Sequence, residues 1–492
     1  MSSATQHIWN PETGIIDIEV PWQDLAASEM PGIRLMWEEQ RERLAGTQRL
    51  TTFTDRLRRQ WAIETGILEN LYDIERGVTM TLIERGFHAE FLTHGSTNKP
   101  TPYVINLLRD QEEAFEGVMD FVAKSRQLST SYIKELHAAL LRSQHTTEAT
   151  DTTGKEISVP LIRGDWKIQP NYPTRAGVLY AYCPPEHVAS EMQRLIEMHT
   201  QHLEQGVAPE VEAAWLHHRF SQIHPFQDGN GRVCRAIASL VLVQAGLFPL
   251  IVTRDEKNDY LDALEAADKG NLSKLVALFA KLQRQQFLKA AVVSESVISA
   301  ANDMDSLLQG LEKATPKAQT LAKPNIEKVF DHAHALEQQT SDALDALIPN
   351  LRQYLAKAGI DANIYSCRST EKDSHWYYGQ IKENARNNYH YFINDKVYRS
   401  WVSLRVYWQR RARLVFAFHA ASREFTGTMI CAPFIEFLDP AGENETRATL
   451  IPISDEAFLF FHNEIPDQLK KRFKDWLNPC LLIAIKQLAD GT

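Results

Sequence analysis

Residues 224–235, with the sequence HPFQDGNGRVCR, gather the side chains needed to transfer a group from a polyphosphate. Histidine has an ordinary pKa near neutrality, so His224 can take a proton from an attacking hydroxyl group. Asp228 offers the hard oxygen ligand that Mg²⁺ prefers beside phosphates. Arg232 and Arg235 lie three positions apart and, on one helix face, present forked donors to phosphate oxygens. The spacing therefore predicts a site that binds a metal-bound polyphosphate and activates a nucleophile beside it.

Two helices are expected to hold these side chains between them. Apolar residues recur at helical spacing over 211–223, and the proline after His224 biases it out of the helical region, so the first helix should end there. Turn-forming residues occupy 228–231, and a second helix should run from Arg232 to about Gly246. The start of a helix exposes backbone N–H groups and carries a positive partial charge. The loop is therefore expected to be an anion site.

The loop residues have distinct expected tasks. Gly229 and Gly231 lack a Cβ atom, so phosphate oxygens can approach the backbone. Asn230 can donate to a phosphate oxygen through its amide, and Phe226 is expected to anchor the loop in the core. The DGNG sequence also resembles part of a calcium loop. That register would place Phe226 and Ile237 where carboxylates are required, so a calcium loop is excluded.

The whole stretch resembles the signature of the Fic family, His-x-Phe-x-(Asp/Glu)-Gly-Asn-Gly-Arg-x-x-Arg, and it matches every fixed position. Members of this family mostly transfer AMP from ATP to a hydroxyl group of a target protein. The resemblance implies an enzyme, a protein adenylyltransferase with ATP as co-substrate and Mg²⁺ as cofactor. It implies that His224 is the base and Asp228 holds the metal. The Gly229–Gly231 loop with Asn230 would cradle the phosphates, and Arg235 would reach the γ-phosphate.

A stretch upstream of the motif, residues 164–185, resembles the flap of the same family. In the family, the flap is a β-hairpin that registers a target segment by main-chain pairing. Ile168, Val178 and Tyr180 are expected in its strands, with residues 170–177 as its loop.

A second upstream element resembles the family's inhibitory pattern, Ser/Thr-x-x-x-Glu-Gly/Asn. Thr65, Glu69 and Asn70 match it, and the run 68–86 around them is expected to be helical. The resemblance implies that the Glu69 carboxylate pairs with Arg235 and takes the place of the γ-phosphate, so that ATP binds wrongly or not at all. The alternative is a solvated glutamate on a helix face.

Downstream of the motif, Tyr260 resembles the tyrosine that lines the family's nucleotide pocket. The sequence YLDAL around it has helical character, so Tyr260 is expected on a helix that closes the site. The alternative is an ordinary half-buried helix aromatic, which packs without touching a nucleotide.

Composition bounds the class of protein. The 492 residues, of which 44% are hydrophobic and 24% charged, predict a globular chain of about three domains. The net charge of −10 argues against a nucleic-acid partner. Five scattered cysteines suit a reducing compartment, and the N-terminus lacks the features of a signal peptide, so a cytoplasmic protein is expected. The most apolar stretch, 236–253, contains polar residues and predicts a buried helix rather than a membrane span.

The chain divides into a mainly α catalytic part and an α+β C-terminal part. The predicted order is an N-terminal helical segment with the inhibitory motif at 1–102, a helical Fic domain with its β-hairpin flap at 103–290, a helical linker at 291–324 and an α+β domain at 325–492. One long polar helix is expected from about 272 to 312.

The C-terminal region has no recognised family. It begins with a predicted helix at 325–357, and strand-like runs begin near residues 391, 401, 414 and 427 before a final helix. Basic and aromatic residues alternate over 396–413. This pattern is typical of a solvated sheet face, and contact with nucleic acid or an acidic partner is the alternative.

The predicted function is transfer of AMP from ATP to a Ser, Thr or Tyr hydroxyl of a target protein or of the enzyme itself, held back by Glu69. The same residues would serve removal of AMP, with Glu69 orienting a water molecule. They would also serve transfer of another nucleotide such as UMP. In a further alternative, the C-terminal domain is a module that binds a partner and delivers the catalytic domain to it.

Overall fold

The computed structural model describes residues 5–490 with internal gaps. The gaps are residues 93–94, 151–154, 172–173, 176–177, 302–322, 358, 371, 390–392, 408–410, 422–424, 426, 440–446 and 455–456. The chain forms two compact units, one of residues 1–27 with 44–286 and the other of residues 28–43 with 287–492. The catalytic motif lies in the first unit. The predicted domain boundaries at 102, 290 and 324 stay predictions.

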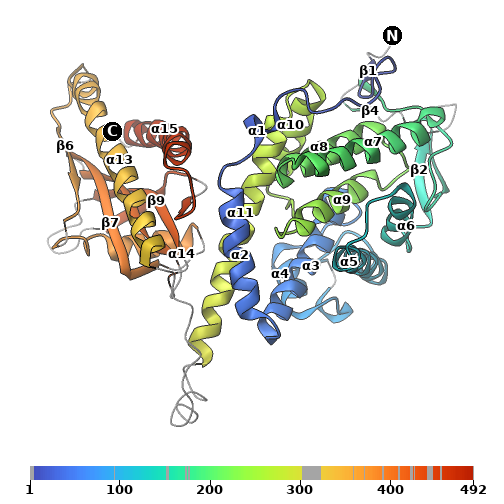
Figure 1. Cartoon of the computed structure of the whole chain (residues 1–492), viewed down its shortest axis with the longest axis horizontal. Helices are drawn as coiled ribbons and strands as arrows, with labels where there is room; N and C mark the ends of the chain where they lie inside the picture. Colours follow the sequence, from blue (N-terminus) through green and yellow to red (C-terminus); the bar gives the residue numbers. More distant parts are fainter. Residues whose placement is uncertain are drawn as a thin grey trace. The chain divides into compact units, whose positions relative to one another are not determined.

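Helices make up most of the first unit, which confirms its mainly α class (Figure 1). In chain order they are α1 (Trp22–Leu25), α3 (Gln48–Leu68), α4 (Arg76–Arg85), the 3₁₀ helix η1 (Ala89–Phe91), α5 (Thr101–Ala123), α6 (Thr130–Leu140), α7 (Pro185–Gln205), α8 (Pro209–Ile223), α9 (Asn230–Gln244), α10 (Lys257–Asp268) and the first part of α11 (Ser273–Ala301). The helix predicted from about 272 to 312 corresponds to α11, and its last part lies outside the described residues.

The two helices that carry the motif, α8 and α9, form the centre of the first unit. Every residue of α9 from Arg232 to Leu242 is buried, and so is every residue of α8 from Glu210 to Phe220. A helix buried on all sides belongs to the core, which confirms the buried helix predicted after the motif. Among the helices described, none combines the length and the apolar character that a membrane crossing needs.

Turn residues set the boundaries of these helices. α8 ends at Ile223, before the His-Pro step, as predicted. His224 itself is left-handed, with φ 51° and ψ 57°, instead of extended as is usual before a proline. α9 begins at Asn230, earlier than the predicted start at Arg232. The reason is Gly229, whose φ of 78° completes the turn one residue before the helix.

Two small sheets lie beside the helices. β2 (Thr146–Thr150) pairs antiparallel with β3 (Glu156–Pro160). β4 (Thr174–Arg175) and β5 (Val178–Ala181) form an antiparallel hairpin, and β1 (Thr5–His7) adds a parallel strand to the other edge of β5. The sequence did not predict β1, β2 or β3. β1 and β2 are short and almost wholly polar, so they carry no hydrophobic alternation, and β3 alternates over only five residues.

The hairpin of β4 and β5 falls within the predicted flap, but its first strand lies elsewhere than expected. Val178 and Tyr180 are in β5 as predicted. Ile168 is outside any strand with 70% of its surface exposed, and β4 falls inside the predicted loop 170–177. Pro170 explains the difference, because it lacks the N–H group that a ladder starting at Ile168 would need.

The second unit is an α+β module, as predicted. Its six-stranded sheet has the order β10-β9-β8-β7-β6, with β11 also paired to β9, and all pairs are antiparallel. The strands are β6 (Asn363–Arg368), β7 (Ile393–Tyr407), β8 (Arg411–Ala421), β9 (Thr428–Asp439), β10 (Arg447–Pro452) and β11 (Phe458–Phe461). β7 unites the two strands predicted near residues 391 and 401, whereas β6, β10 and β11 were not predicted.

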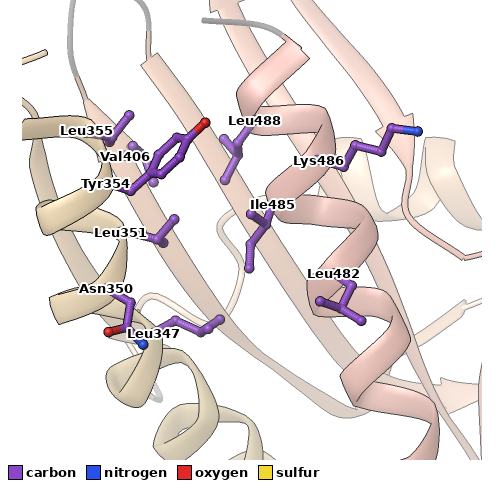
Figure 2. A pocket seen from close by; sticks show the side chains of 10 residues that line it. All are labelled: Leu347, Asn350, Leu351, Tyr354, Leu355, Val406, Leu482, Ile485, Lys486 and Leu488. Carbon is purple, nitrogen blue, oxygen red and sulfur yellow. The ribbon is translucent and has the colours of Figure 1, made fainter. Parts of the chain in front are cut away.

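Helices cover both faces of this sheet. α13 (Lys323–Lys357) and α15 (Pro466–Asp490) pack on the face that presents Val402 and Leu404. α14 (Tyr378–Asn387) packs on the opposite face, which presents Trp401. A cavity of about 490 Å³ lies between α13 and α15, lined mainly by apolar side chains (Figure 2).

A helix from the N-terminal part of the chain also belongs to the second unit. α2 (Met30–Leu44) contributes residues 30–43. The backbone at Gly32 lies against the Phe461 ring, so closely that a Cβ atom there would collide with it. Arg472 lies 3.7 Å from the carboxylate of Glu29, which precedes the helix. The sequence did not predict this association.

Candidate active site

His224 lies at the turn between α8 and the loop. Its backbone N–H donates to Phe220 O at 2.9 Å, and its ring stacks on Tyr182 with 4.1 Å between ring centroids. The Nδ1 atom lies 3.4 Å from Ser221 O. A proton on Nδ1 would point at this carbonyl oxygen, so Nε2 is the ring nitrogen that can act as a base.

Asn230 closes the loop from the first position of α9. Its Oδ1 atom accepts the N–H of Phe226 at 2.9 Å, and its Nδ2 atom donates to Phe226 O at 2.8 Å. The side chain is therefore a clamp within the loop. The predicted contact of Asn230 with a phosphate stays a prediction, and it would need the second amide hydrogen or the backbone N–H.

Phe226 is fully buried, which confirms its expected role as an anchor. Its ring stacks on His137, a residue that sequence reasoning missed, with 3.7 Å between centroids. His137 Nε2 donates to Asp228 O at 3.0 Å, and Nδ1 accepts the N–H of Gly164 at 2.9 Å. Burial lowers the pKa of His137 to about 4, so the ring is neutral and keeps this pattern of donor and acceptor. His137 thus fixes the backbone at Asp228.

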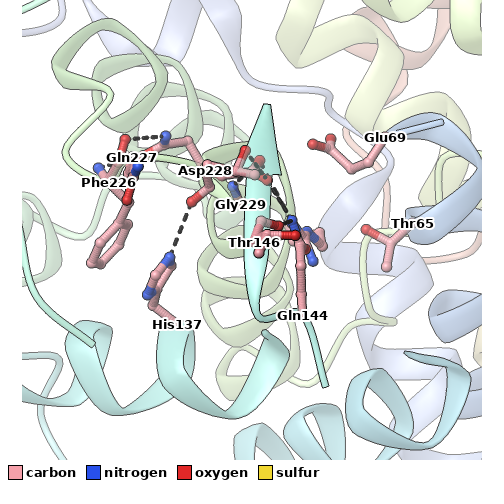
Figure 3. Close-up of polar contacts among 12 residues, drawn as sticks. Thr65, Glu69, His137, Gln144, Thr146, Phe226, Gln227, Asp228 and Gly229 are labelled. Carbon is pink, nitrogen blue, oxygen red and sulfur yellow. Dashed lines mark hydrogen bonds and ion pairs between the residues drawn. The ribbon is translucent and has the colours of Figure 1, made fainter. Parts of the chain in front are cut away.

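The Asp228 carboxylate is held by several donors (Figure 3). Oδ1 accepts the N–H of Gly229 at 2.6 Å, and Oδ2 accepts from Gln144 Nε2 at 2.6 Å and from Thr147 Oγ1 at 3.1 Å. Burial alone would raise the pKa of Asp228, but the Arg232 guanidinium and these hydrogen bonds hold it below its usual range. The carboxylate is therefore ionised and oriented, as a metal ligand must be.

Arg232 is completely buried beneath the loop. Its Nη2 atom donates to Gln144 Oε1 at 2.9 Å and lies 3.7 Å from Asp228 Oδ1. Within the described part of the chain, its Nε and Nη1 atoms have no hydrogen-bond partner. A buried guanidinium with unsatisfied donors calls for an anion beside it.

Arg235, one turn further along α9, contacts the predicted inhibitory element. Its Nε atom donates to Thr65 Oγ1 at 2.7 Å, and its Nη2 atom donates to Thr65 O at 3.2 Å and to Glu69 Oε1 at 2.9 Å. Burial opposes the charge, but the neighbouring Glu69 raises the pKa of Arg235 above its ordinary value. Thr65, in the last turns of α3, and Glu69, just after the helix, thus engage the same guanidinium (Figure 3).

The end of α3 corrects the helix predicted over 68–86. Asn70 has φ 54°, Asn70 N donates to Ile67 O, and Leu71 N donates to Gly66 O, each at 3.0 Å. This is a Schellman motif, in which Gly or Asn takes the left-handed position after the cap. α3 therefore ends at Leu68, and the chain becomes helical again only at α4.

The Glu69 carboxylate lies against the start of α9. A Cβ atom added to Gly231 would collide with it, so the carboxylate occupies the space that the missing side chain leaves. Backbone N–H groups at a helix start favour an anion at this place. The Glu69 carboxylate therefore lies where the sequence predicts an anion site.

Tyr260 lies in a buried polar cluster behind Arg235. Its hydroxyl group is 2.8 Å from His217 Nε2, and Cys234 Sγ is 3.1 Å from the same nitrogen. Only 5% of the Tyr260 surface is exposed. Contact between Tyr260 and a nucleotide stays a prediction. In this arrangement the Tyr260 hydroxyl group contacts the same His217 nitrogen as Cys234 of α9.

The donor set fits a metal held largely by phosphate oxygens. Across the described residues, no group of three or more His, Cys, Asp or Glu side chains could hold a metal ion. Asp228 is thus the carboxylate available at the loop, and one carboxylate with substrate phosphates and water is the usual arrangement for Mg²⁺. The buried Nε and Nη1 atoms of Arg232, without a partner among the described residues, are donors of the kind that a phosphate accepts from.

The chain is similar to proteins of one family. Residues 127–242 match the Fic/DOC family model. A Fido domain-containing protein of Dictyostelium discoideum is 38% identical over 90 residues, 18% of this chain and 62% of that protein. A Protein adenylyltransferase Fic of Nematostella vectensis is 26% identical over 160 residues, 32% of this chain and 33% of that protein. Protein adenylyltransferase fic-1 of Caenorhabditis elegans is 29% identical over 97 residues, 20% of this chain, and the match spans only 19% of that protein.

Among solved structures, a Fic domain-containing signaling protein of Bacteroides thetaiotaomicron aligns with a TM-score of 0.44 at 20% identity. The alignment covers 55% of this chain and 97% of that one.

The neutral state of His137 predicts a specific loss of stability in acid. Its pKa falls from 6.5 to about 4 on folding, so its contribution is complete above pH 6.5 and is lost as the pH falls toward 4. Between pH 7 and pH 5 this amounts to about 2 kcal/mol of the free energy of unfolding. Denaturant unfolding of the wild type and His137→Gln at both pH values measures it. Equal pH dependence in the two proteins would contradict a neutral, buried His137.

Proposed function

Residues 127–242 form a Fic/DOC-family domain, and from this premise we propose that the protein transfers AMP from ATP to a hydroxyl group of a protein. The acceptor is a Ser, Thr or Tyr side chain of a target or of the enzyme itself. The cytoplasmic location expected from the sequence belongs to the same proposal.

One observation carries the proposal: a carboxylate already occupies the start of α9 next to two buried arginines. Glu69 fills the space over Gly231 and bonds Arg235. A site that holds a carboxylate beside a guanidinium at the start of a helix also suits a phosphate, which offers more oxygens of the same kind. The unpartnered Nε and Nη1 atoms of Arg232 add donors at the same loop.

His224 supplies the chemistry beside this anion site. Its Nε2 atom takes the proton of the acceptor hydroxyl group, whose oxygen forms a bond to the α-phosphorus of ATP. The bond from that phosphorus to the oxygen bridging to the β-phosphate breaks, and pyrophosphate leaves with the electron pair. Tyr182 and the Ser221 carbonyl orient the ring for this step.

Asp228 is the residue that would hold Mg²⁺. Its ionised carboxylate is aimed by Gly229, Gln144 and Thr147. When bound, the metal neutralises phosphate charge and favours departure of pyrophosphate.

Glu69 is proposed to keep the enzyme at rest. Its bond to Arg235 removes a donor from the γ-phosphate, and its own negative charge repels the triphosphate. The Asn70 turn fixes the carboxylate at this place, so the inhibition is built into the end of α3.

The same position favours a second activity, removal of AMP from a modified protein. A carboxylate next to the loop could orient a water molecule for attack on the phosphodiester. In that case Glu69 would be required for the reaction instead of suppressing it, which makes the two activities separable by experiment.

Loss of the base should abolish transfer and spare nucleotide binding. In a Glu69→Gly background, His224→Ala is expected to lower the rate by about 10² to 10⁴, as general bases typically contribute this much. His224→Asn should behave alike, because Asn tolerates the left-handed conformation at this position. Single-turnover transfer from labelled ATP gives the rate, and calorimetry gives the ATP affinity. A rate within a factor of two of the parent would exclude His224 as the base.

Loss of the Asp228 carboxylate should weaken the contribution of Mg²⁺ to ATP binding. In the same background, Asp228→Ala is expected to weaken ATP binding in the presence of Mg²⁺ more than His224→Ala does, because Asp228 is the carboxylate of the loop. Calorimetry with and without Mg²⁺ separates the two contributions. An affinity that responds to Mg²⁺ in Asp228→Ala as it does in the parent would argue against the metal role.

Removal of the inhibitory carboxylate should activate the enzyme. A charge-assisted pair such as Glu69 with Arg235 contributes about 1.5 to 3 kcal/mol, so Glu69→Gly should raise transfer by about 10- to 150-fold. Arg235→Ala should not activate, because that arginine also serves ATP, and the double variant should resemble Arg235→Ala. Mass spectrometry after incubation with ATP and cell lysate reports the transferred mass and the target.

The exposed Glu75, on the same connection between α3 and α4, offers a matched control. Glu75→Gly should leave the rate unchanged. An unchanged rate in a well-folded Glu69→Gly protein would falsify the inhibitory role. Loss of AMP removal from a pre-modified substrate in Glu69→Gly would favour the hydrolytic activity instead.

A further inference from the structure

A short segment, Gly164–Lys167, runs alongside the catalytic loop and is not explained by nucleotide binding. Its first residue donates its N–H to His137 Nδ1 at 2.9 Å. The Trp166 ring lies 4.9 Å from the Phe226 ring, measured between centroids. Lys167 donates its backbone N–H to Pro225 O at 2.9 Å. The segment therefore braces the loop at several successive residues.

The Lys167 side chain turns inward at the end of this segment. Only 3% of its surface is exposed, and its Nζ atom donates to Ile223 O at 3.5 Å. None of the ion pairs found among the described residues includes Lys167. Burial lowers its pKa to about 8, which reflects how poorly an ammonium group is tolerated there. A buried lysine without a carboxylate is unfavourable for folding, so a role beyond packing is indicated.

The two bonds of Lys167 bracket His224. The backbone N–H holds the carbonyl of the residue after it, and the ammonium group holds the carbonyl of the residue before it. His224 itself has φ 51° and ψ 57°, a left-handed conformation that a non-glycine residue rarely adopts and that needs support from its surroundings. Lys167 thus bonds directly to the peptide group between Ile223 and His224, and it also holds the peptide group between Pro225 and Phe226. The backbone is fixed on both sides of His224 by one residue.

We propose that Lys167 is a positioning residue for the base, and that it holds the His224 backbone in the conformation that aims the imidazole at the acceptor hydroxyl group. The inference rests on the proposed function for its effect on rate, but the geometric part does not. A lysine is suited to this task because its long stem reaches the buried carbonyl of Ile223 and its ammonium group bonds without requiring a fixed plane.

The effect on rate is tested in the Glu69→Gly background with Lys167→Met, which keeps the length of the stem and removes the ammonium group. The expected result is a kcat lower by about tenfold to 10²-fold, the scale of a small misplacement of a catalytic group, with KM for ATP unchanged. Lys167→Arg should restore most of the rate. Lys134→Met is the matched control, because Lys134 contacts Asp165 and Trp166 of the same segment but neither neighbour of His224. Its kcat should stay within about threefold of the parent.

A double-mutant cycle tells positioning from general loosening. If Lys167 acts through His224, Lys167→Met should add nothing to the loss already caused by His224→Asn. If the fold-loss in kcat of the double variant equals the product of the two single losses, the proposal is overturned. An unchanged kcat in Lys167→Met would also overturn it.

A measurement without turnover keeps this inference separate from the proposed function. In protein with ¹³C-labelled histidine, the resonance absent from His224→Asn belongs to His224. It should move in Lys167→Met, return toward its position in Lys167→Arg and stay in place in Lys134→Met. If the Glu69→Gly parent transfers nothing, the proposed function fails while this experiment still decides whether Lys167 positions His224. An unmoved resonance in Lys167→Met would overturn the inference.

Discussion

Two guanidinium groups are buried inside the protein core, and the rest of the site supplies hydrogen-bond acceptors and negative charge to them. Arg232 and Arg235 lie on α9, at 0% and 2% exposure. Charges taken out of water need partners, and each surrounding element supplies some of them. Gln144, from the connection before β2, satisfies part of Arg232, and α3 satisfies Arg235 through Thr65 and Glu69. The Nε and Nη1 atoms of Arg232 stay without a partner among the described residues, and buried donors of this kind favour a nearby anion.

The need of the buried Arg235 guanidinium for acceptors gives a physical reason for the spacing of the inhibitory pattern. Thr65 and Glu69 are four residues apart, so both face α9 from one side of α3 and share the Arg235 guanidinium. Asn70 follows because the helix must end there in a left-handed residue, which only Gly or Asn adopts readily.

The sequence predicted the parts of the site that lie close together in the chain. The α8–loop–α9 unit followed from helical periodicity, the His-Pro step and the glycines, and the pairing of Glu69 with Arg235 followed from a family resemblance. Asn70 matches the inhibitory pattern, and its preference for the left-handed position after a helix was the signal that could have placed the end of α3 at Leu68.

The residues that were missed are brought in by tertiary packing. His137 lies near the end of α6, Gln144 in the connection after it and Thr147 in the polar strand β2. Nothing local marks them as neighbours of Asp228. The same holds for Lys167, whose partners are two backbone carbonyls that no side-chain pattern reveals. In the second unit, β6, β10 and β11 are short, and their place in the sheet depends on pairing with strands distant in sequence.

The membership of α2 in the second unit has a practical consequence for dissecting the protein. The chain passes from one unit to the other at residue 28, returns at residue 44 and leaves again at residue 287. A truncation after residue 286 would keep α2 but remove the rest of the unit to which it belongs, including Phe461, against which Gly32 packs, and Arg472, which pairs with Glu29. An isolated catalytic fragment of that length would carry a helix without its partners. Because the second unit includes residues 28–43 from the N-terminal part of the chain, the protein is best expressed and purified as the full chain.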